Sequence, residues 1–128
     1  MTISLTIPGR PVPKGRPRMG VRTKGRRMTP VVYTPSATKR YEEKVRIMAL
    51  AAGVRPVDGP VALEADLWLY GRRGDGDNYW KSLADGLNGV AYHDDRQIVD
   101  WRLRIHRARR REDERAEIVI RRVEEETA

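Results

Sequence analysis

Two aspartates separated by one glycine are the residues in this sequence whose spacing is best suited to chemistry. Asp75 and Asp77 lie in the stretch GRRGDGDNYWK, which spans residues 71–81 and ends at Lys81. On an extended turn this spacing lets both carboxylates point toward one place, and carboxylate oxygens are ligands that Mg²⁺ prefers. A cation held there would polarise a phosphodiester and lower the pKa of an attacking water molecule.

A second acidic group follows in YHDDRQ, residues 92–97, which contains Asp94 and Asp95. The helix expected over residues 78–87 is short enough for the chain to fold back and bring one of these carboxylates toward the first pair. Carboxylates gathered on a cationic surface repel one another unless a cation lies between them. The residues therefore predict a site for a hard divalent cation, and they leave open whether Asp94 or Asp95 completes it.

The same side chains also have a purely structural interpretation. Asp77 would cap the helix that begins at Asn78, and Asp75 would be an ordinary turn residue. Lys81 would pair along the helix with Asp77 or with Asp85. On this interpretation the chain is a noncatalytic nucleic-acid-binding module. A titration with a divalent metal separates the two hypotheses, because only the enzyme needs the cation for cleavage.

The chain is strongly basic. It has 128 residues, with 26 Lys and Arg against 18 Asp and Glu, which gives a formal charge of +8. Ten of these cations and none of the acids lie within the first 41 residues. This asymmetry favours a polyanionic partner, because binding to a phosphate backbone releases counterions.

We expect a basic arm over about residues 10–32 to wrap a nucleic-acid backbone, with affinity that falls steeply as salt rises. Prolines and glycines recur there too often for a helix or a central strand, so we predict a long irregular loop. A solvated, disordered segment is the alternative. The residues expected to contact the backbone are Lys14, Arg16, Arg18, Arg22, Lys24, Arg26 and Arg27.

The composition excludes several other classes of protein. The chain has no cysteine, and therefore neither a disulfide framework nor a thiolate metal site. The stretch MTISLTIPGR lacks the features of a signal peptide, and no apolar run approaches the length of a membrane span. We expect a cytoplasmic protein without a membrane partner.

Hydrophobic periodicity predicts an α+β fold in one domain, residues 1–128. We expect a two-layer sandwich of four mostly antiparallel strands, with both helices on one face and the long basic loop added. The predicted elements, in order, are a strand over residues 3–7, the basic loop, a helix from Pro35 to about Gly53, a strand over residues 61–69, a helix over residues 78–87, and strands over residues 99–105 and 116–120.

The aromatic residues of the strands divide into two groups. Trp101 follows the apolar alternation of its strand, so we expect it in the core. Trp68 and Tyr70 fall on the opposite face of their strand. That face would suit a dimer interface or the stacking of unpaired bases.

Taken together, these residues resemble the RusA family of Holliday junction resolvases. The motif P-x-P-K-G-R-P-R at Pro11–Arg18 and the motif Y-T-P at Tyr33–Pro35 extend the resemblance over most of the chain. The pattern D-x-D-N-x-x-K-x-x-x-D-x-L, followed after a short gap by D-D-x-Q-I, is matched by Asp75, Asp77, Asn78, Lys81, Asp85, Leu87, Asp94, Asp95, Gln97 and Ile98.

The resemblance implies a homodimeric, Mg²⁺-dependent endonuclease that nicks four-way DNA junctions symmetrically, with Mn²⁺ expected to substitute for Mg²⁺. It places three metal-binding aspartates at Asp75, Asp77 and Asp95. It also implies an essential lysine at Lys81, so these four are the expected catalytic residues. Because the segment before Asp94 is slightly shorter than the family pattern, Asp94 competes with its neighbour as the third ligand. A metal nuclease for flaps or other branched DNA is a further alternative.

Overall fold

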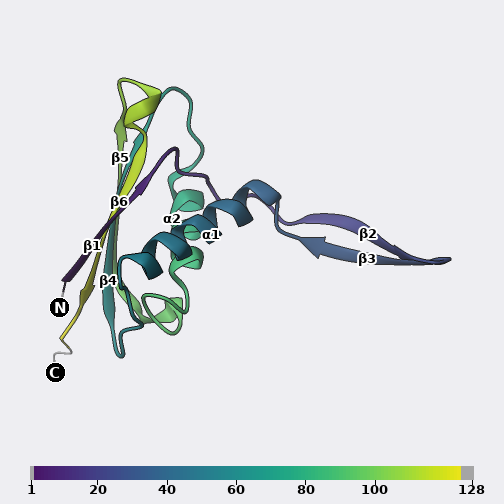
Figure 1. Cartoon of the computed structure of the whole chain (residues 1–128), viewed down its shortest axis with the longest axis horizontal. Helices are drawn as coiled ribbons and strands as arrows, with labels where there is room; N and C mark the ends of the chain where they lie inside the picture. Colours follow the sequence, from purple (N-terminus) through teal and green to yellow (C-terminus); the bar gives the residue numbers. More distant parts are fainter. Residues whose placement is uncertain (1, 125–128) are drawn as a thin grey trace.

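The computed structural model describes residues 2–124 of the chain (Figure 1). Every predicted helix and strand is present, and two additional strands lie within the segment predicted to be a loop. In the described part of the chain, no helix has both the length and the hydrophobicity of a membrane span. The elements, in chain order, are β1 (Thr2–Pro8), β2 (Arg18–Lys24), β3 (Arg27–Tyr33), α1 (Ser36–Ala51), β4 (Val61–Leu69), α2 (Gly76–Leu87), the short 3-10 helix η1 (Asp95–Gln97), β5 (Ile98–Arg107), the short 3-10 helix η2 (Arg111–Asp113) and β6 (Arg115–Arg122).

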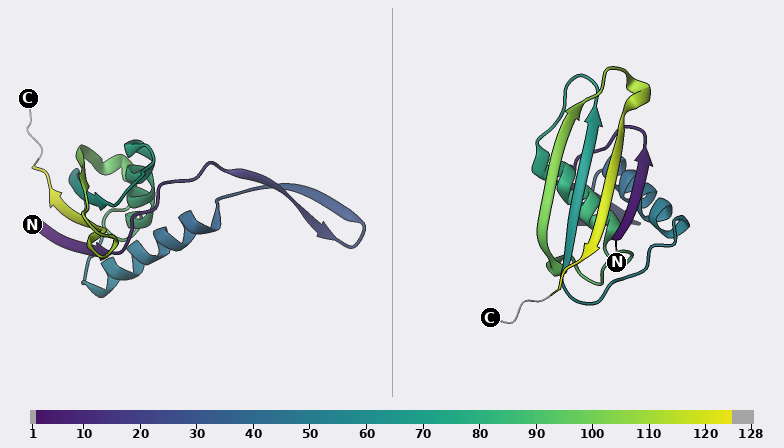
Figure 2. Two further views of the ribbon diagram at one scale, coloured as in Figure 1. Left: turned by 90° about the horizontal axis from the view of Figure 1, so that it is seen from above. Right: turned by 90° about the vertical axis from the view of Figure 1, so that its left-hand side faces the viewer.

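Four of the strands form one mixed sheet in the order β1-β6-β4-β5. β6 pairs antiparallel with both β1 and β4, whereas β4 and β5 run parallel and are joined by a crossover that contains α2. Both helices cover the same face of this sheet (Figure 2). The predicted α+β architecture, with two layers and mostly antiparallel pairing, is therefore confirmed.

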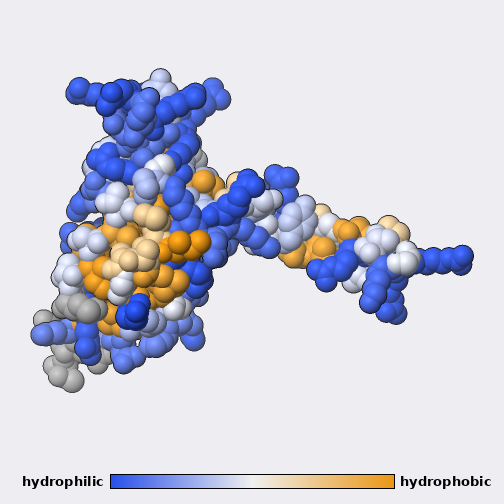
Figure 3. Space-filling model, in the orientation of Figure 1, coloured by the Kyte–Doolittle hydropathy of each residue, from blue (hydrophilic) through white to orange (hydrophobic). Residues whose placement is uncertain are grey.

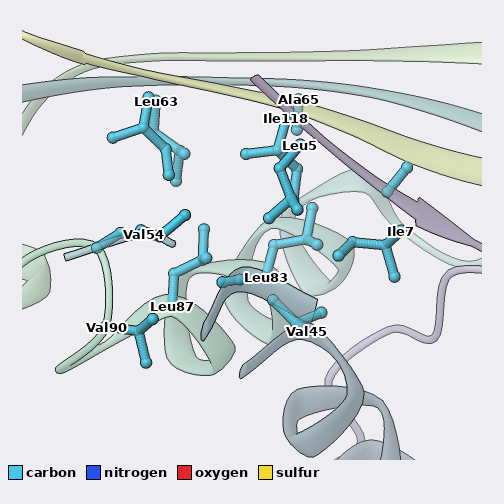
Figure 4. Close-up of a cluster of buried hydrophobic side chains, with 14 of the residues drawn as sticks. Leu5, Ile7, Val45, Val54, Leu63, Ala65, Leu83, Leu87, Val90 and Ile118 are labelled. Atoms are coloured by element: carbon cyan, nitrogen blue, oxygen red, sulfur yellow. The ribbon is translucent and has the colours of Figure 1, made fainter. Parts of the chain in front are cut away.

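The hydrophobic core lies between the sheet and the two helices (Figure 4). β4 contributes Leu63, and α2 contributes Leu83 and Leu87, all at 1% exposure or less. The helices approach each other closely at Gly86, where an added Cβ would lie 3.0 Å from Cβ of Val45. Because one side of α2 is held in the core in this way, its opposite side is presented to solvent.

β2 and β3 form a β-hairpin that projects from the body of the protein beyond the start of α1 (Figures 1 and 2). We call residues 18–33 the arm. The prediction of an irregular loop is wrong for this segment. Gly25 has φ 62° at the two-residue turn, a conformation that glycine adopts readily. Pro30 is tolerated because the hairpin has only two strands, so its missing N–H faces no third strand.

Trp101 is not a core residue, contrary to the prediction. It lies on β5, an edge strand, and its side chain is 60% exposed. Its ring packs against that of Trp80 on α2, with the ring centroids 5.1 Å apart. The alternation correctly identifies a face of the strand, but it does not reveal that α2 covers this edge only in part.

The other face of the sheet carries no helix within residues 2–124 (Figure 2). Paired charges line it instead. Nε2 of His106 lies 2.8 Å from Oδ1 of Asp66. The His106 ring also stacks on Trp68, at 4.5 Å between centroids. The guanidinium of Arg115 lies 3.9 Å from the centroid of the same indole. Trp68 is therefore already in contact with two partners from its own chain.

Candidate functional site

The first acidic pair lies where α2 begins. Asp75 is the N-cap residue of α2, but its side chain makes no capping hydrogen bond. Asp77 lies in the first turn of the helix and is exposed. The preceding loop is anchored by the buried Tyr79, whose hydroxyl accepts a hydrogen bond from the Gly74 N–H at 3.0 Å. The N-cap residue is thus Asp75 and not Asp77, to which the structural interpretation gave that role, and the side chain of Asp75 makes no capping hydrogen bond.

Lys81 lies one helical turn after Asp77 and turns toward it. Its Nζ is 4.0 Å from Oδ2 of Asp77, with side-chain exposures of 61% and 70%. Lys81 and Asp85 make no ion pair, because the carboxylate of Asp85 is held by Lys14 at 2.9 Å. An exposed pair at 4.0 Å contributes little to stability, so the ammonium group of Lys81 is available to a ligand.

A small cavity of about 230 Å³ opens beside Lys81. It lies between α2 and the start of β5, and Asp85 and Asp95 face it from the two sides. The stacked Trp80 and Trp101 form its apolar wall. Lys81 thus has acidic neighbours in both directions along α2.

Asp94 and Asp95 have different surroundings. Oδ1 of Asp94 accepts a hydrogen bond from the Arg96 N–H at 2.9 Å, and its carboxylate also pairs with the Arg96 guanidinium. In return, Oε1 of Gln97 accepts a hydrogen bond from the Asp94 N–H at 3.0 Å, which completes a capping box at η1. Asp95 lines the cavity instead. Of the two competitors, only Asp95 lines this cavity.

The pKa values of the two neighbours move in opposite directions. The N–H of Arg96, assisted by its guanidinium, holds the pKa of Asp94 below its usual range. Partial burial, together with the carboxylates of Asp94 and Asp85, raises the pKa of Asp95. Negative charge is therefore concentrated at Asp95 without a nearby cation that fully offsets it.

The acidic groups do not converge on a single point. Within residues 2–124, no three acidic or histidine side chains lie close enough together to hold one metal ion. Asp77 and Asp85 are separated by about 12 Å along the axis of α2, from the rise of 1.5 Å per residue. The structure brings Asp77 near Lys81 and brings Asp95 near Asp85, but it leaves these two acidic groups on opposite sides of Lys81.

Lys14 is engaged within the protein. Its Nζ lies 2.7 Å from Glu42 on α1 and 2.9 Å from Asp85 on α2, and its backbone N–H donates to the Asn78 carbonyl at 2.8 Å. Partial burial alone would lower the pKa of Lys14, but the hydrogen bonds and charges of the two carboxylates raise it overall. Lys14 therefore joins both helices at the root of the arm, rather than being free for phosphate as predicted.

The other predicted DNA contacts lie at the surface of the protein. All six side chains are exposed, and none pairs with a carboxylate in the part of the chain that the structure describes. The six are Arg16, Arg18, Arg22, Lys24, Arg26 and Arg27. All of them except Arg16 belong to the arm.

The family model for the endodeoxyribonuclease RusA matches residues 8–121, a span that includes the arm, α2 and both acidic groups. The chain belongs to the RusA family. Proteins of this family are endonucleases of the Holliday junction resolvase type, as the resemblance implied. The chain is also 28% identical over 146 residues to the uncharacterized protein YqaN of Bacillus subtilis (strain 168), covering 94% of this chain and 96% of that protein.

In this RusA-family chain, the sequence patterns did not single out Asp85 as a site residue. It appeared only as a motif position and as a helix partner for Lys81. The structure places it between Lys14 and the cavity that it shares with Asp95. Its spacing of i+4 from Lys81 and i+8 from Asp77 puts the three on one side of α2, and this stripe is the signal that could have found it.

Proposed function

We propose that this protein is a homodimeric, Mg²⁺-dependent endonuclease that cuts four-way DNA junctions by paired phosphodiester hydrolysis. One observation carries the proposal. The exposed stripe of α2 presents Lys81 between acidic groups, with Asp77 on one side and Asp85 and Asp95 on the other. On a chain of this net charge, such an acidic stripe is otherwise unexpected.

The donor chemistry fits a hard divalent cation. Asp75 makes no capping hydrogen bond, Asp77 is exposed, and Asp95 has a raised pKa that an added positive charge would lower. Mg²⁺ is usually bound by one or two carboxylates together with water and substrate phosphates. A preformed cluster of three acids is therefore not required. Mn²⁺, which accepts the same oxygen ligands, is expected to substitute.

Four residues have a role in this proposal. Asp75, Asp77 and Asp95 would supply carboxylate oxygens to one or two cations. When bound, the cation supplies charge neutralisation at the scissile phosphate and an activated water molecule. Lys81 would donate hydrogen bonds to a non-bridging phosphate oxygen and stabilise the charge that develops there.

The basic arm would hold the DNA on which these residues act. Its exposed cations can neutralise backbone phosphates, so affinity should fall linearly on a plot of log K against log[salt]. A four-way junction has two strands to be cut. A two-fold dimer supplies one active site for each of them.

The proposal is tested by separating cleavage from binding. Asp77→Asn keeps the shape of the side chain and removes its charge, so cleavage of a four-way junction in Mg²⁺ should fall on the order of 100-fold or more. Binding to the same junction should survive. The matched control is Asp113→Asn, which changes an acid paired with Arg110 in η2 and should cleave normally.

Three results would count against the proposal. Cleavage at the wild-type rate by Asp77→Asn or by Asp75→Asn refutes the assigned roles. Tight junction binding by the wild type without cleavage in Mg²⁺ or Mn²⁺ favours the noncatalytic module. Faster cleavage of a flap than of a four-way junction, with a linear duplex as the reference, moves the substrate to other branched DNA.

A further inference from the structure

The loop that leads into the candidate site is exposed along its whole length. Residues 70–75 join β4 to α2, and all six are exposed. None of them belongs to the hydrophobic core, and the end of the body that carries them has a hydrophilic surface, at the top of Figure 3. The position of Asp75, at the end of this loop, therefore depends on polar contacts and not on apolar packing.

Arg10 binds the backbone of this loop at two places. Its guanidinium donates hydrogen bonds to the carbonyl oxygens of Tyr70, at 2.8 Å, and of Arg72. Arg10 follows β1 and lies at least 60 residues from both partners in sequence. A guanidinium presents several N–H donors in one rigid plane, so a single side chain can hold both carbonyl groups in a fixed relation.

Glu114 joins Arg10 to the same loop. This residue lies between η2 and β6, and its carboxylate pairs with the Arg10 guanidinium. Its Oε2 also accepts a hydrogen bond from the Tyr70 N–H at 3.0 Å. The Glu114 carbonyl oxygen accepts a further hydrogen bond from the Gly9 N–H, next to Arg10, at 3.1 Å. One ion pair thus ties the end of β1 and the start of β6 to the loop before Asp75.

The burial of this carboxylate needs an explanation. Within residues 2–124, Glu114 is the only charged residue with a buried side chain, at 7% exposure. Burial of a charged group costs free energy that an ion pair does not reliably offset, and apolar residues can often replace such a pair without loss of stability. Apolar residues could not hold the N–H and carbonyl groups of residues 70–72. The pair is therefore suited to fixing the loop rather than to stabilising the fold.

We propose that Arg10 and Glu114 are positioning residues, which fix residues 70–75 so that Asp75 and Asp77 can hold the cation. They act through the loop, and neither needs to touch the cation or the DNA. The role of the two aspartates rests on the proposed function. The order that the ion pair gives to the loop does not, because it can be measured without metal or DNA.

Amide hydrogen exchange in the metal-free protein measures that order. Arg10→Lys keeps the positive charge beside Glu114 but replaces the planar guanidinium with one ammonium group, which cannot span the two carbonyl oxygens of the loop. Exchange of the Tyr70 N–H should become faster on the order of tenfold or more, because its acceptor is no longer held in place. Exchange within the buried strand β4 should match that of the wild type.

The dependence of cleavage on metal is the second measurement. If a looser loop displaces Asp75, cation binding weakens, and added cation restores it. The Mn²⁺ concentration for half-maximal cleavage of a four-way junction should rise on the order of tenfold in Arg10→Lys. Cleavage should recover at saturating Mn²⁺. Glu114→Gln keeps an oxygen for the Tyr70 N–H, so it should shift the Mn²⁺ concentration in the same direction by a smaller factor.

A core substitution separates positioning from stability. Ile120 is fully buried on β6 and lies opposite Leu63 on β4, towards the end of that strand away from the loop. Ile120→Val lowers stability by removing a buried methyl group. It should leave both the Tyr70 exchange and the half-maximal Mn²⁺ concentration unchanged at a temperature where every variant is folded.

The outcomes distinguish this proposal from its alternatives. Unchanged exchange at Tyr70 in Arg10→Lys overturns it, and weaker junction binding in that case makes Arg10 a DNA contact. Faster exchange with an unchanged Mn²⁺ dependence also overturns it, because the ion pair is then only structural. A wild type that does not cleave in Mn²⁺ contradicts the proposed function instead, and the exchange at Tyr70 still decides whether Arg10 orders the loop.

Discussion

Asp94 and Asp95 are adjacent in sequence but have different environments. The carboxylate of Asp94 is used to cap η1 and to pair with Arg96. The carboxylate of Asp95 faces the cavity beside Lys81. Cleavage should therefore depend on the second aspartate and not on the first.

Asp95→Asn should lower junction cleavage on the order of 100-fold or more, because it removes a carboxylate that would hold the cation at the reacting phosphate. Asp94→Asn is the matched control, since asparagine caps a helix nearly as well as aspartate, and it should retain near-wild-type cleavage. Single-turnover cleavage of a four-way junction in Mg²⁺ measures both. The reverse order of effects would make Asp94 the third ligand.

Lys14 shows that a basic residue in a basic segment can have a structural role. Lys14→Ala leaves the carboxylates of Glu42 and Asp85 without their cation, which should lower the free energy of unfolding by about 1 kcal/mol. It should also reduce cleavage, because Asp85 is no longer held beside the cavity. The salt dependence of DNA binding should be unchanged, since the charge of Lys14 is already neutralised within the protein.

Arg22→Ala is the contrasting variant. Arg22 is exposed on the arm, so its loss should leave the melting temperature unchanged and reduce the slope of log K against log[salt] by about 0.9. Urea unfolding and junction binding at several salt concentrations measure both variants. If Lys14→Ala flattens the salt slope and leaves stability intact, Lys14 is a phosphate contact after all.

At the scale of elements, the position of α2 depends on its close approach to α1 at Gly86. Gly86→Ala gains about 1 kcal/mol in helix propensity but crowds Val45 and the Glu42 carbonyl oxygen, at 3.0 and 3.1 Å from the added Cβ. Overpacking costs about 1–3 kcal/mol, so we expect a net loss of about 1 kcal/mol in urea unfolding. Gly76→Ala, where the nearest atom is a flexible leucine methyl at 3.4 Å, should be nearly neutral. Equal stability of the two variants would show that the helices can separate at no cost.

The arm should be removable without unfolding the body. None of residues 19–32 belongs to the core, and Arg18 is paired directly with Tyr33. Replacing residues 19–32 with two glycines should therefore preserve the melting temperature. It removes four cations, so the salt slope of junction binding should fall by about 3 to 4. An unchanged slope would mean that the arm does not contact the backbone.

Periodicity was sufficient to predict the elements that pack on the core. Leu63 and Leu67 repeat every second residue because one side of β4 is buried, and Leu83 and Leu87 repeat at helical spacing for the same reason. The arm was missed because its alternation, Met19 to Val21 and Met28 to Val32, is interrupted by a proline and has no core to indicate which face is buried. Its Gly25-Arg26 turn was the available signal.

The candidate site was only partly predictable, because its contacts join distant parts of the chain. The spacing of Asp75, Asp77 and Lys81 is local, so the sequence displays it directly. The pairing of Lys14 with Glu42 spans 28 residues and depends on how α1 packs on α2. A local pattern cannot provide that information.

At the scale of the whole molecule, exposed positive and negative charges lie in different parts of the structure. Five exposed cations that make no ion pair within residues 2–124 lie on the projecting arm, whereas the acids of the site lie on the body along α2 and η1 (Figure 1). This separation lets the arm hold the DNA backbone while the acidic stripe remains available to a cation. If these cations and acids lay side by side, they would form ion pairs with each other, and neither group would be available to DNA or to a metal ion.

The most direct measurement is the anomalous scattering of Mn²⁺ in crystals of the protein with a four-way junction. We predict one or two manganese peaks bonded to carboxylate oxygens from the set Asp75, Asp77 and Asp95, with a DNA phosphate in the coordination shell and Lys81 hydrogen-bonded to that phosphate. A junction bound with no manganese at these aspartates, or with manganese held by Asp94, would contradict the account.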